Sequence, residues 1–282
     1  MPKSLFQLFF SIHQLSIDVA LGAAAVLFGL STALRIHIPW YFYVLLINGT
    51  FLIYWVDHIQ DSRQTVLVQA GARHAIFKVY RRVFYIAIAC LVLGNALLVY
   101  LFLSIQSILL GSGLLLVLLA YLRFHRTLKR IIALEKEILI AFLYTCSTGF
   151  AACIVFTSSF VSDWLVFAFL LLSVFCSCIQ NVFSLARIES QQDAQWGIRN
   201  ISHLLGATRI KVLQELLLCL QALICITFLV LFPHLSLLVF SLLLLMVATI
   251  NYALPYFYVQ AIHPSYRWLG DGAFLLLFLC GL

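Results

Sequence analysis

Long apolar stretches, separated by short polar segments, run along almost the whole chain. Within each stretch the hydrophobic residues follow one another without the every-second-residue alternation of a membrane β-strand, so helices are predicted. Each stretch is close to the ~20 residues that a helix needs to cross the hydrocarbon core of a bilayer. The pattern therefore predicts about nine transmembrane helices, at about 15–35, 39–57, 83–104, 106–122, 137–157, 160–183, 212–232, 235–258 and 268–282.

Composition excludes a soluble protein. Of the 282 residues, 64% are hydrophobic and only 10% are charged, and the mean hydropathy is +1.09. A soluble domain is about half apolar and about a quarter charged, and its core could not hide this much apolar surface. We therefore predict an all-α, polytopic membrane bundle. No linker or low-complexity stretch divides the chain, so we expect one domain over residues 1–282.

The net charge of +7 is distributed unevenly between the two sides of the predicted bundle. When the loops alternate between the sides, all 17 lysines and arginines except Arg35 fall on the side of the N-terminus. By the positive-inside rule this side is cytoplasmic, and the odd number of spans puts the C-terminus on the opposite side. The positive charge therefore reports the orientation of a multi-pass membrane protein and does not indicate nucleic-acid binding. We expect the protein to lie in a prokaryotic inner membrane.

Two pairs of acids stand out at the cytoplasmic ends of predicted helices. Asp57 and Asp61 follow one apolar run, and Glu189 and Asp193 follow another. Side chains at i and i+4 share a helix face, where like charges repel unless a cation lies between them. Mg²⁺ suits such carboxylates, because it takes oxygen ligands and is commonly shared with the phosphates of a substrate. The alternative is that both pairs are only solvated helix ends.

A family resemblance sharpens this interpretation. The stretch ESQQDAQWGIRNISHLLG, which starts at Glu189 and ends at Gly206, resembles the second aspartate motif of the UbiA-type membrane prenyltransferases, DxxxDxxxG with a further glycine nine residues on. Asp57 and Asp61 resemble the last two acids of the family's first motif, NDxxDxxxD. The leading Asn-Asp of that motif would fall at Ile53 and Tyr54 and is absent. Nine helices, with acids after the second and the sixth, also match the layout of the family.

The resemblance implies transfer of a prenyl group from a prenyl diphosphate to a lipophilic, usually aromatic, acceptor at the cytoplasmic face. It implies Mg²⁺ as cofactor, held by Asp57, Asp61, Glu189 and Asp193, which would be the catalytic residues. Polar and basic neighbours are the candidates for binding substrate: Asn181, Arg63, Lys129, Arg130, Arg199 and the intramembrane acid Asp18. Alternatively, Asn181 forms a hydrogen bond to a neighbouring helix, and Asp18 is a buried acid with hydrogen-bond partners inside the protein.

Two other functions remain open at this point. A transporter or lipid-binding membrane protein could use the same basic face for an anionic ligand, and dependence on a divalent metal would distinguish it from the enzyme. A catalytically degenerate, prenyltransferase-like subunit would agree with the missing Asn-Asp, and absence of turnover would identify it. The acceptor, the length of the prenyl chain, the pathway and the oligomeric state do not follow from the sequence.

Overall fold

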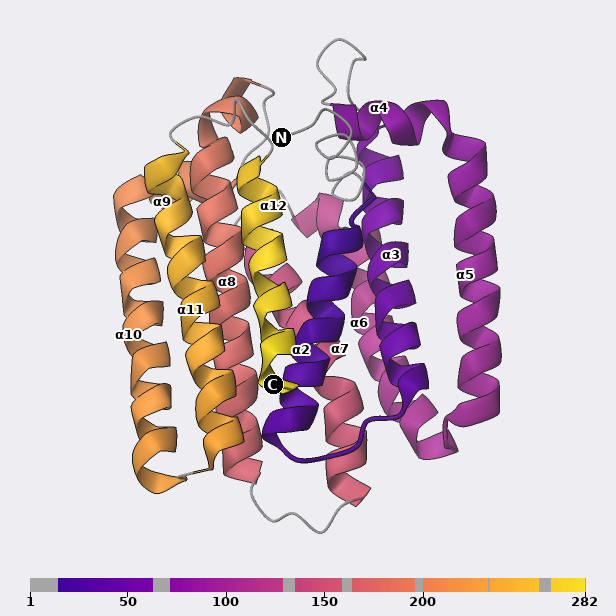
Figure 1. Ribbon diagram of the computed structural model, residues 1–282. Coiled ribbons are helices and arrows are strands. Elements are labelled where there is room, and N and C mark those ends of the chain that lie inside the picture. Colours follow the sequence, from indigo (N-terminus) through magenta and orange to yellow (C-terminus); the bar gives the residue numbers. More distant parts are fainter. Residues whose placement is uncertain are drawn as a thin grey trace, which may run out of the picture.

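The computed structural model describes residues 15–62, 72–128, 135–158, 164–195, 200–232, 234–258 and 265–281. Within these ranges all regular structure is helical, and Figure 1 shows the helices standing side by side in one bundle. The elements are α2 (Ile17–Ala33), α3 (Trp40–Ser62), α4 (Ala72–Val79), α5 (Arg81–Phe102), α6 (Ile105–Leu128), α7 (Glu135–Ser158), α8 (Trp164–Gln195), α9 (Ile201–Leu205), α10 (Ala207–Leu231), α11 (Leu235–Phe257), α12 (Ser265–Gly272) and the 3₁₀ helix η1 (Ala273–Gly281).

Six of these helices are long and apolar enough to cross a membrane. They comprise Trp40–Ile59 of α3, α5, Ile138–Phe156 of α7, α8, α10 and α11. Helix α2 and the segment Ile105–Val117 of α6 are apolar but shorter, and the last predicted span is divided between α12 and η1. The prediction of an all-α, multi-pass membrane bundle is thereby confirmed in its coarser form, whereas the number of nine crossings stays a prediction.

Helix α2 lies in the middle of the bundle because its side chains are small. It packs against α3, α7, α11, α12 and η1, and most of its residues are buried. Small residues let helix backbones approach closely, which is the main source of packing contacts between membrane helices. The closest approach is at Gly29, where an added Cβ would lie 2.5 Å from the ring of the fully buried Phe240.

We expect Gly29→Ala to destabilise the bundle by about 1–3 kcal/mol, the usual cost of overpacking a well-filled core. The matched control is Gly94→Ala on α5, where nothing lies within 4 Å of the added Cβ. This control should leave stability unchanged or raise it slightly, since alanine favours helix over glycine. Thermal unfolding of the detergent-solubilised variants measures both effects. Equal melting temperatures for Gly29→Ala and the parent protein would contradict the packing argument.

A row of buried polar groups joins α8 to α10 and α11. Gln214 of α10 donates to the Ser184 hydroxyl at 2.8 Å, and Gln221 donates to the Ser177 hydroxyl at 2.7 Å. Ser184 in turn donates to the backbone carbonyl of Asn251 at 2.6 Å. Polar side chains in lipid-embedded helices are satisfied by such bonds between helices. The row therefore fixes the register of α8, the helix that carries the second acid pair.

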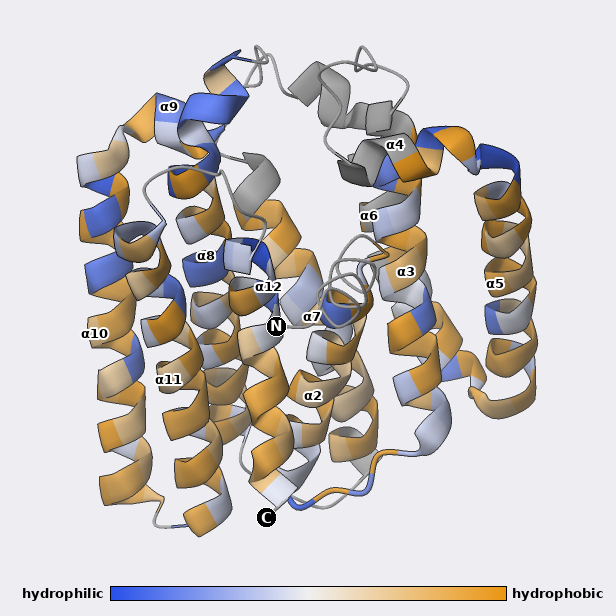
Figure 2. Ribbon diagram, turned by 45° about the horizontal axis from the view of Figure 1, so that its top comes forward, coloured by the Kyte–Doolittle hydropathy of each residue, from blue (hydrophilic) through white to orange (hydrophobic). Residues whose placement is uncertain are grey.

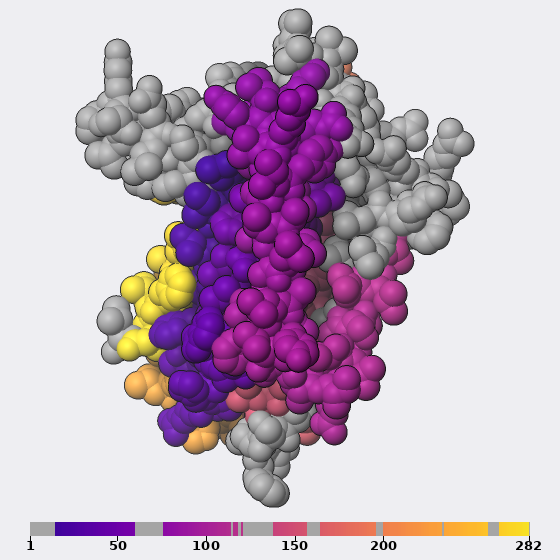
Figure 3. Space-filling model, turned by 90° about the vertical axis from the view of Figure 1, so that its right-hand side faces the viewer, coloured from indigo at the N-terminus to yellow at the C-terminus, as the bar shows by residue number. Residues whose placement is uncertain are grey.

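Helix α5 lies on the outer side of the bundle, and Phe84 is its one buried residue (Figure 3). It is attached to α3 by the ring of Phe84, which packs against Trp55 and stacks on Phe77 at a centroid distance of 4.1 Å. A further bond joins Asn48 of α3 to Asn95 of α5 at 2.9 Å. Figure 2 shows that apolar residues cover most of the outer helices, while polar ones gather at the end where α4 and α9 lie. Such a surface suits contact with lipid.

The two acid-bearing helices end at the same end of the bundle. Helix α4 follows α3, helix α9 follows α8, and both short helices lie at the top of Figure 1. Helix α8 has 32 residues, so it is about 48 Å long at 1.5 Å per residue, longer than the ~30 Å hydrocarbon core. The predicted sixth span ends at residue 183, but the helix continues to Gln195. Helix α8 is therefore longer than one crossing requires, and Glu189 and Asp193 lie in its last turns.

Candidate functional site

The second acid pair lies on the last three turns of α8, facing α12. Glu189 is held by α12 through two residues that follow one another in the chain, Tyr266 and Arg267. The Arg267 guanidinium donates through Nε to Oε1 of Glu189 and through Nη2 to Oε2 at 2.5 Å, a two-pronged ion pair. The Tyr266 hydroxyl donates to Oε1 at 2.8 Å. Both carboxylate oxygens of Glu189 thus accept hydrogen bonds from α12.

The electrostatics around Glu189 keep both partners in their donating forms. Burial raises the pKa of Tyr266, and the neighbouring Glu189 carboxylate raises it further, so the phenol stays protonated. Burial alone would lower the pKa of Arg267, but the attraction of Glu189 outweighs it and raises the pKa overall. The Glu189 side chain is 13% exposed and that of Arg267 is 33% exposed. The pair is therefore mostly shielded, with part of the guanidinium accessible.

Asp193 is held by the loop that follows α8. Its Oδ2 accepts from the side-chain amide of Asn200 at 2.7 Å, and the same amide also donates to the backbone carbonyl of Ala186 at 3.1 Å. The side-chain oxygen of Asn200 caps α9 by accepting from the backbone N–H groups of Ser202 and His203. Asn200 therefore positions Asp193 and also caps the first turn of α9. The sequence analysis did not select Asn200, although an asparagine before a short apolar run is a helix-start signal.

His203 closes the same loop back onto α8. Its Nδ1 accepts from the backbone N–H of Asn200 at 3.3 Å, so Nε2 carries the proton and donates to the Ser190 carbonyl at 2.7 Å. One turn later Gly206 adopts a φ of +79°, a left-handed value that a side chain disfavours, between α9 and α10. The glycine that matches the end of the motif is thus explained by backbone geometry at this turn.

The first acid pair lies at the end of α3. Asp57 is partly exposed, and in the described ranges it has no hydrogen-bond or ion-pair partner. Asp61 lies in the last turn of α3, but its side chain is outside the described residues, as is Arg63. No described bond joins Asp57 to Glu189 or Asp193. The two helices are connected through α7, which packs against both, and also through α2 and α12.

Of the polar residues predicted within the spans, Asp18 is buried and Asn181 is partly buried. Asn181 donates to the Asp271 carboxylate at 2.8 Å, which joins α8 to α12. Asp18 is 2% exposed, and its Oδ1 accepts from the backbone N–H of Val19 at 3.0 Å. Both residues thus take part in hydrogen bonds within the protein. The predicted phosphate partners Lys129, Arg130 and Arg199 lie outside the described residues.

Mg²⁺ fits some of these residues better than others. Asp57 has no described partner, and Asp193 has one oxygen outside its bond to Asn200, so both offer carboxylate oxygens to a metal. Glu189 offers less, because both of its oxygens accept from α12 and because Arg267 would repel a second cation. In the part of the chain that the structure describes, no group of three or more His, Cys, Asp or Glu residues is gathered as a metal centre.

Comparisons with known proteins give no match. No family model matches the chain, and neither a curated protein nor a solved structure does. The resemblance to the UbiA-type prenyltransferases therefore rests on the residues of the two acid motifs and on the layout of the helices.

Proposed function

We propose that this protein transfers a prenyl group from a prenyl diphosphate to a lipophilic acceptor, with Mg²⁺ as cofactor, at the cytoplasmic face of a membrane. The observation that carries the proposal is that the acid-bearing ends of α3 and α8 share one end of an apolar helical bundle. A prenyl diphosphate needs this combination, because its charged head requires cations and its tail requires a hydrocarbon environment. The proposal includes nine crossings, with the N-terminus in the cytoplasm and the C-terminus opposite.

Asp57, Asp61 and Asp193 would hold the metal, which, when bound, neutralises the diphosphate and makes it a better leaving group. The bond between the allylic carbon and the diphosphate oxygen breaks, and the electron pair leaves with the diphosphate. The acceptor then bonds to the allylic carbon and releases a proton. Because the prenyl tail would lie in hydrocarbon, exclusion of water from the reaction would favour transfer to the acceptor over hydrolysis.

Arg267 has a place in this proposal that the sequence pattern did not suggest. The ion pair with Glu189 uses its Nε and Nη2 donors and leaves the two N–H groups of Nη1 outside the pair. A fixed guanidinium of this kind suits phosphate oxygens, which it can bind through parallel hydrogen bonds. We propose that Glu189 orients Arg267 toward the diphosphate, and that metal binding falls mainly to the three aspartates.

The proposal is tested by the binding of an unreactive substrate analogue. Farnesyl and geranylgeranyl thiodiphosphate are titrated onto the full-length protein in nanodiscs, with Mg²⁺ or with EDTA. We expect saturable binding of at least one chain length in Mg²⁺ and its loss in EDTA. Equal binding under both conditions would support the transporter or lipid-binding alternative, and no binding of either analogue would contradict the proposal.

The degenerate subunit is a second candidate, favoured by one observation. Arg267 already neutralises the charge of Glu189, which the family motif would use for metal. This alternative predicts that the analogue binds but that no labelled diphosphate is released from a reactive prenyl diphosphate over a panel of quinone and other aromatic acceptors. Release of diphosphate with any acceptor of the panel would exclude it.

A further inference from the structure

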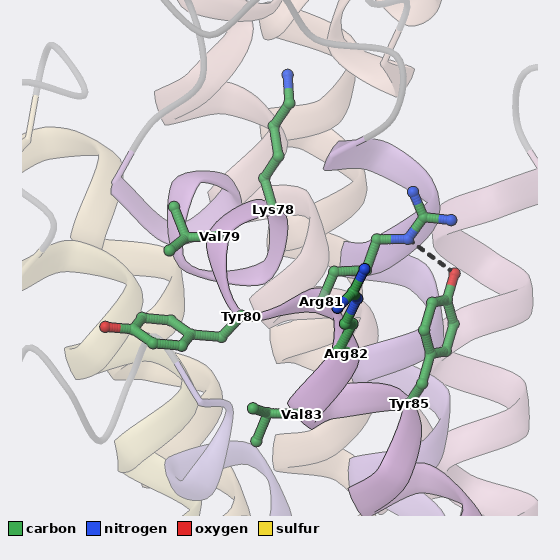
Figure 4. Close-up of a pocket in the computed structure, with 7 residues that line it drawn as sticks. All are labelled: Lys78, Val79, Tyr80, Arg81, Arg82, Val83 and Tyr85. Carbon is green, nitrogen blue, oxygen red and sulfur yellow. Dashed lines mark hydrogen bonds between the residues drawn. The ribbon is translucent and has the colours of Figure 1, made fainter.

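A group of basic residues lies at the corner between α4 and α5, which packs against α3 beside the first acid pair. Lys78, Arg81 and Arg82 are exposed there, and together with Val79, Tyr80, Val83 and Tyr85 they line a recess of about 610 Å³ (Figure 4). This volume is in the range of ligand pockets. Lys78 lies at the end of α4, and Arg81 and Arg82 begin α5, so the three residues lie within five positions of the chain.

The cations of this corner have no acidic partner in the described structure. Residues 72–102, which form α4 and α5, contain no Asp or Glu, and no described ion pair involves Lys78, Arg81 or Arg82. The only described polar contact of the three side chains is from Nε of Arg81 to the Tyr85 hydroxyl at 3.1 Å, with the guanidinium 5.3 Å from the centre of that ring. Among the described residues no acid offsets their positive charge, and all three residues are exposed.

Packed aromatic side chains attach the α4–α5 corner to α3. Phe77 and Phe84, one on each side of the turn, are buried and stacked, and Trp55 of α3 packs against Phe84 at 5.3 Å. The aromatic side chains are buried, whereas Lys78, Arg81 and Arg82 are exposed. In Figure 4 the apolar Val83 lies on the opposite side of the two arginines from Lys78. Charged and apolar side chains thus line the same recess.

An exposed apolar lane leads from the corner down α5. Ile86, Leu93 and Leu97 follow Arg82 at spacings of four, seven and four residues, which place them on one helix face. Their exposures are 67%, 70% and 57%. From Arg82 to Leu97 the lane is about 22 Å long at 1.5 Å per residue. Figure 3 shows α5 running along this outer face of the molecule.

We propose that the α4–α5 corner is a binding site for an anionic phospholipid. Lys78, Arg81 and Arg82 bind the phosphate and headgroup, and an acyl chain lies along Ile86, Leu93 and Leu97. A free phosphate would use only the cations and leave the lane uncovered, whereas a lipid uses both in one molecule. Clusters of basic residues at a membrane boundary bind anionic lipids, and each basic residue near the surface raises the affinity about fivefold. This site does not depend on the proposed enzymatic function.

Native mass spectrometry of the full-length protein tests the proposal. The protein is released from detergent after equilibration with phosphatidylglycerol and phosphatidylcholine of identical acyl chains in equal amounts, without divalent metal. We expect at least tenfold more phosphatidylglycerol than phosphatidylcholine among the retained lipids. The double variant Arg81→Gln, Arg82→Gln should lose this preference, because it keeps the apolar lane and removes two of the three cations.

The matched control is Arg209→Gln with Lys211→Gln, which removes two exposed basic residues of α10. It should retain the preference of the parent protein. The proposal is overturned if the parent protein retains both lipids equally, if the Arg81 and Arg82 double variant keeps its preference, or if the control loses it to the same extent. It is also overturned if millimolar inorganic phosphate displaces phosphatidylglycerol. The same holds if the Arg81 and Arg82 double variant changes the proportion of dimer in the spectrum but not the amount of retained lipid.

Discussion

Asp193→Asn is expected to reduce the Mg²⁺-dependent affinity for a prenyl thiodiphosphate by about 100-fold or more. Loss of even a supporting residue near a metal commonly costs 10–100-fold in affinity. Asparagine keeps the size of aspartate and can still meet the amide of Asn200, which donates to Oδ2 at 2.7 Å. The variant therefore removes a charge with little change of shape. Asp57→Asn should have the same effect from the other helix.

Titration of the analogue onto both variants in nanodiscs measures the loss. Glu215→Gln is the matched control, because this acid is exposed on α10 and pairs with Lys211 at 3.8 Å, outside the predicted metal site. It should bind as the parent protein does. If Asp193→Asn loses binding and Asp57→Asn retains it, the diphosphate does not lie between the two acid pairs, and the proposed two-helix site is wrong.

Glu189→Gln is expected to destabilise the folded protein by about 2–3 kcal/mol. Removal of one partner from a fully buried ion pair costs about 3–5 kcal/mol, because the other charge is left without compensation. The cost here is smaller, since the Arg267 side chain is 33% exposed and solvent screens part of its charge. Tyr266 would also exchange a charged acceptor for a neutral one.

A double-mutant cycle separates this ion pair from its surroundings. The free energies of unfolding of Glu189→Gln, Arg267→Gln and the double variant are measured in detergent by denaturant titration. We expect the double variant to be more stable than the sum of the two single losses predicts, by about 1–2 kcal/mol, as for directly coupled residues. Lys211→Gln with Glu215→Gln is the control pair, exposed and 3.8 Å apart, and should show almost no coupling. Additive losses at Glu189 and Arg267 would contradict the ion pair.

The helices were predictable from the sequence because hydrophobic length is a local property. A run of about 20 apolar residues has one stable form in lipid, with every backbone group bonded within its own helix. Each predicted range does contain helix, but the ends differ where the chain leaves the apolar stretch. Residues 184–195 are polar enough to suggest a loop, yet they continue α8 because Glu189 and Asp193 bond to α12 and to Asn200. The short helix α9 falls in the same predicted loop.

The acids of the candidate site were also visible in the sequence, because spacing along one helix decides which side chains share a face. The hydrogen-bond and ion-pair partners of those acids could not be identified from the sequence. Arg267 looked like one of many cytoplasmic cations, but it lies 78 residues from Glu189 in the chain and is its ion-pair partner. Asp271 is 90 residues from Asn181 and is its hydrogen-bond partner.

The sequence by itself determined a helical membrane protein, the approximate positions of its helices and two pairs of acids at helix ends, because hydrophobicity and helical periodicity act over short distances. Only the tertiary structure decided that Glu189 is neutralised by Arg267, that Asn200 holds Asp193, and that three cations stand above an apolar lane on α5. These contacts depend on how α8, α12 and α5 pack against their neighbours. That packing is set by complementary shapes at close helix approaches such as Gly29 against Phe240, which no local pattern encodes.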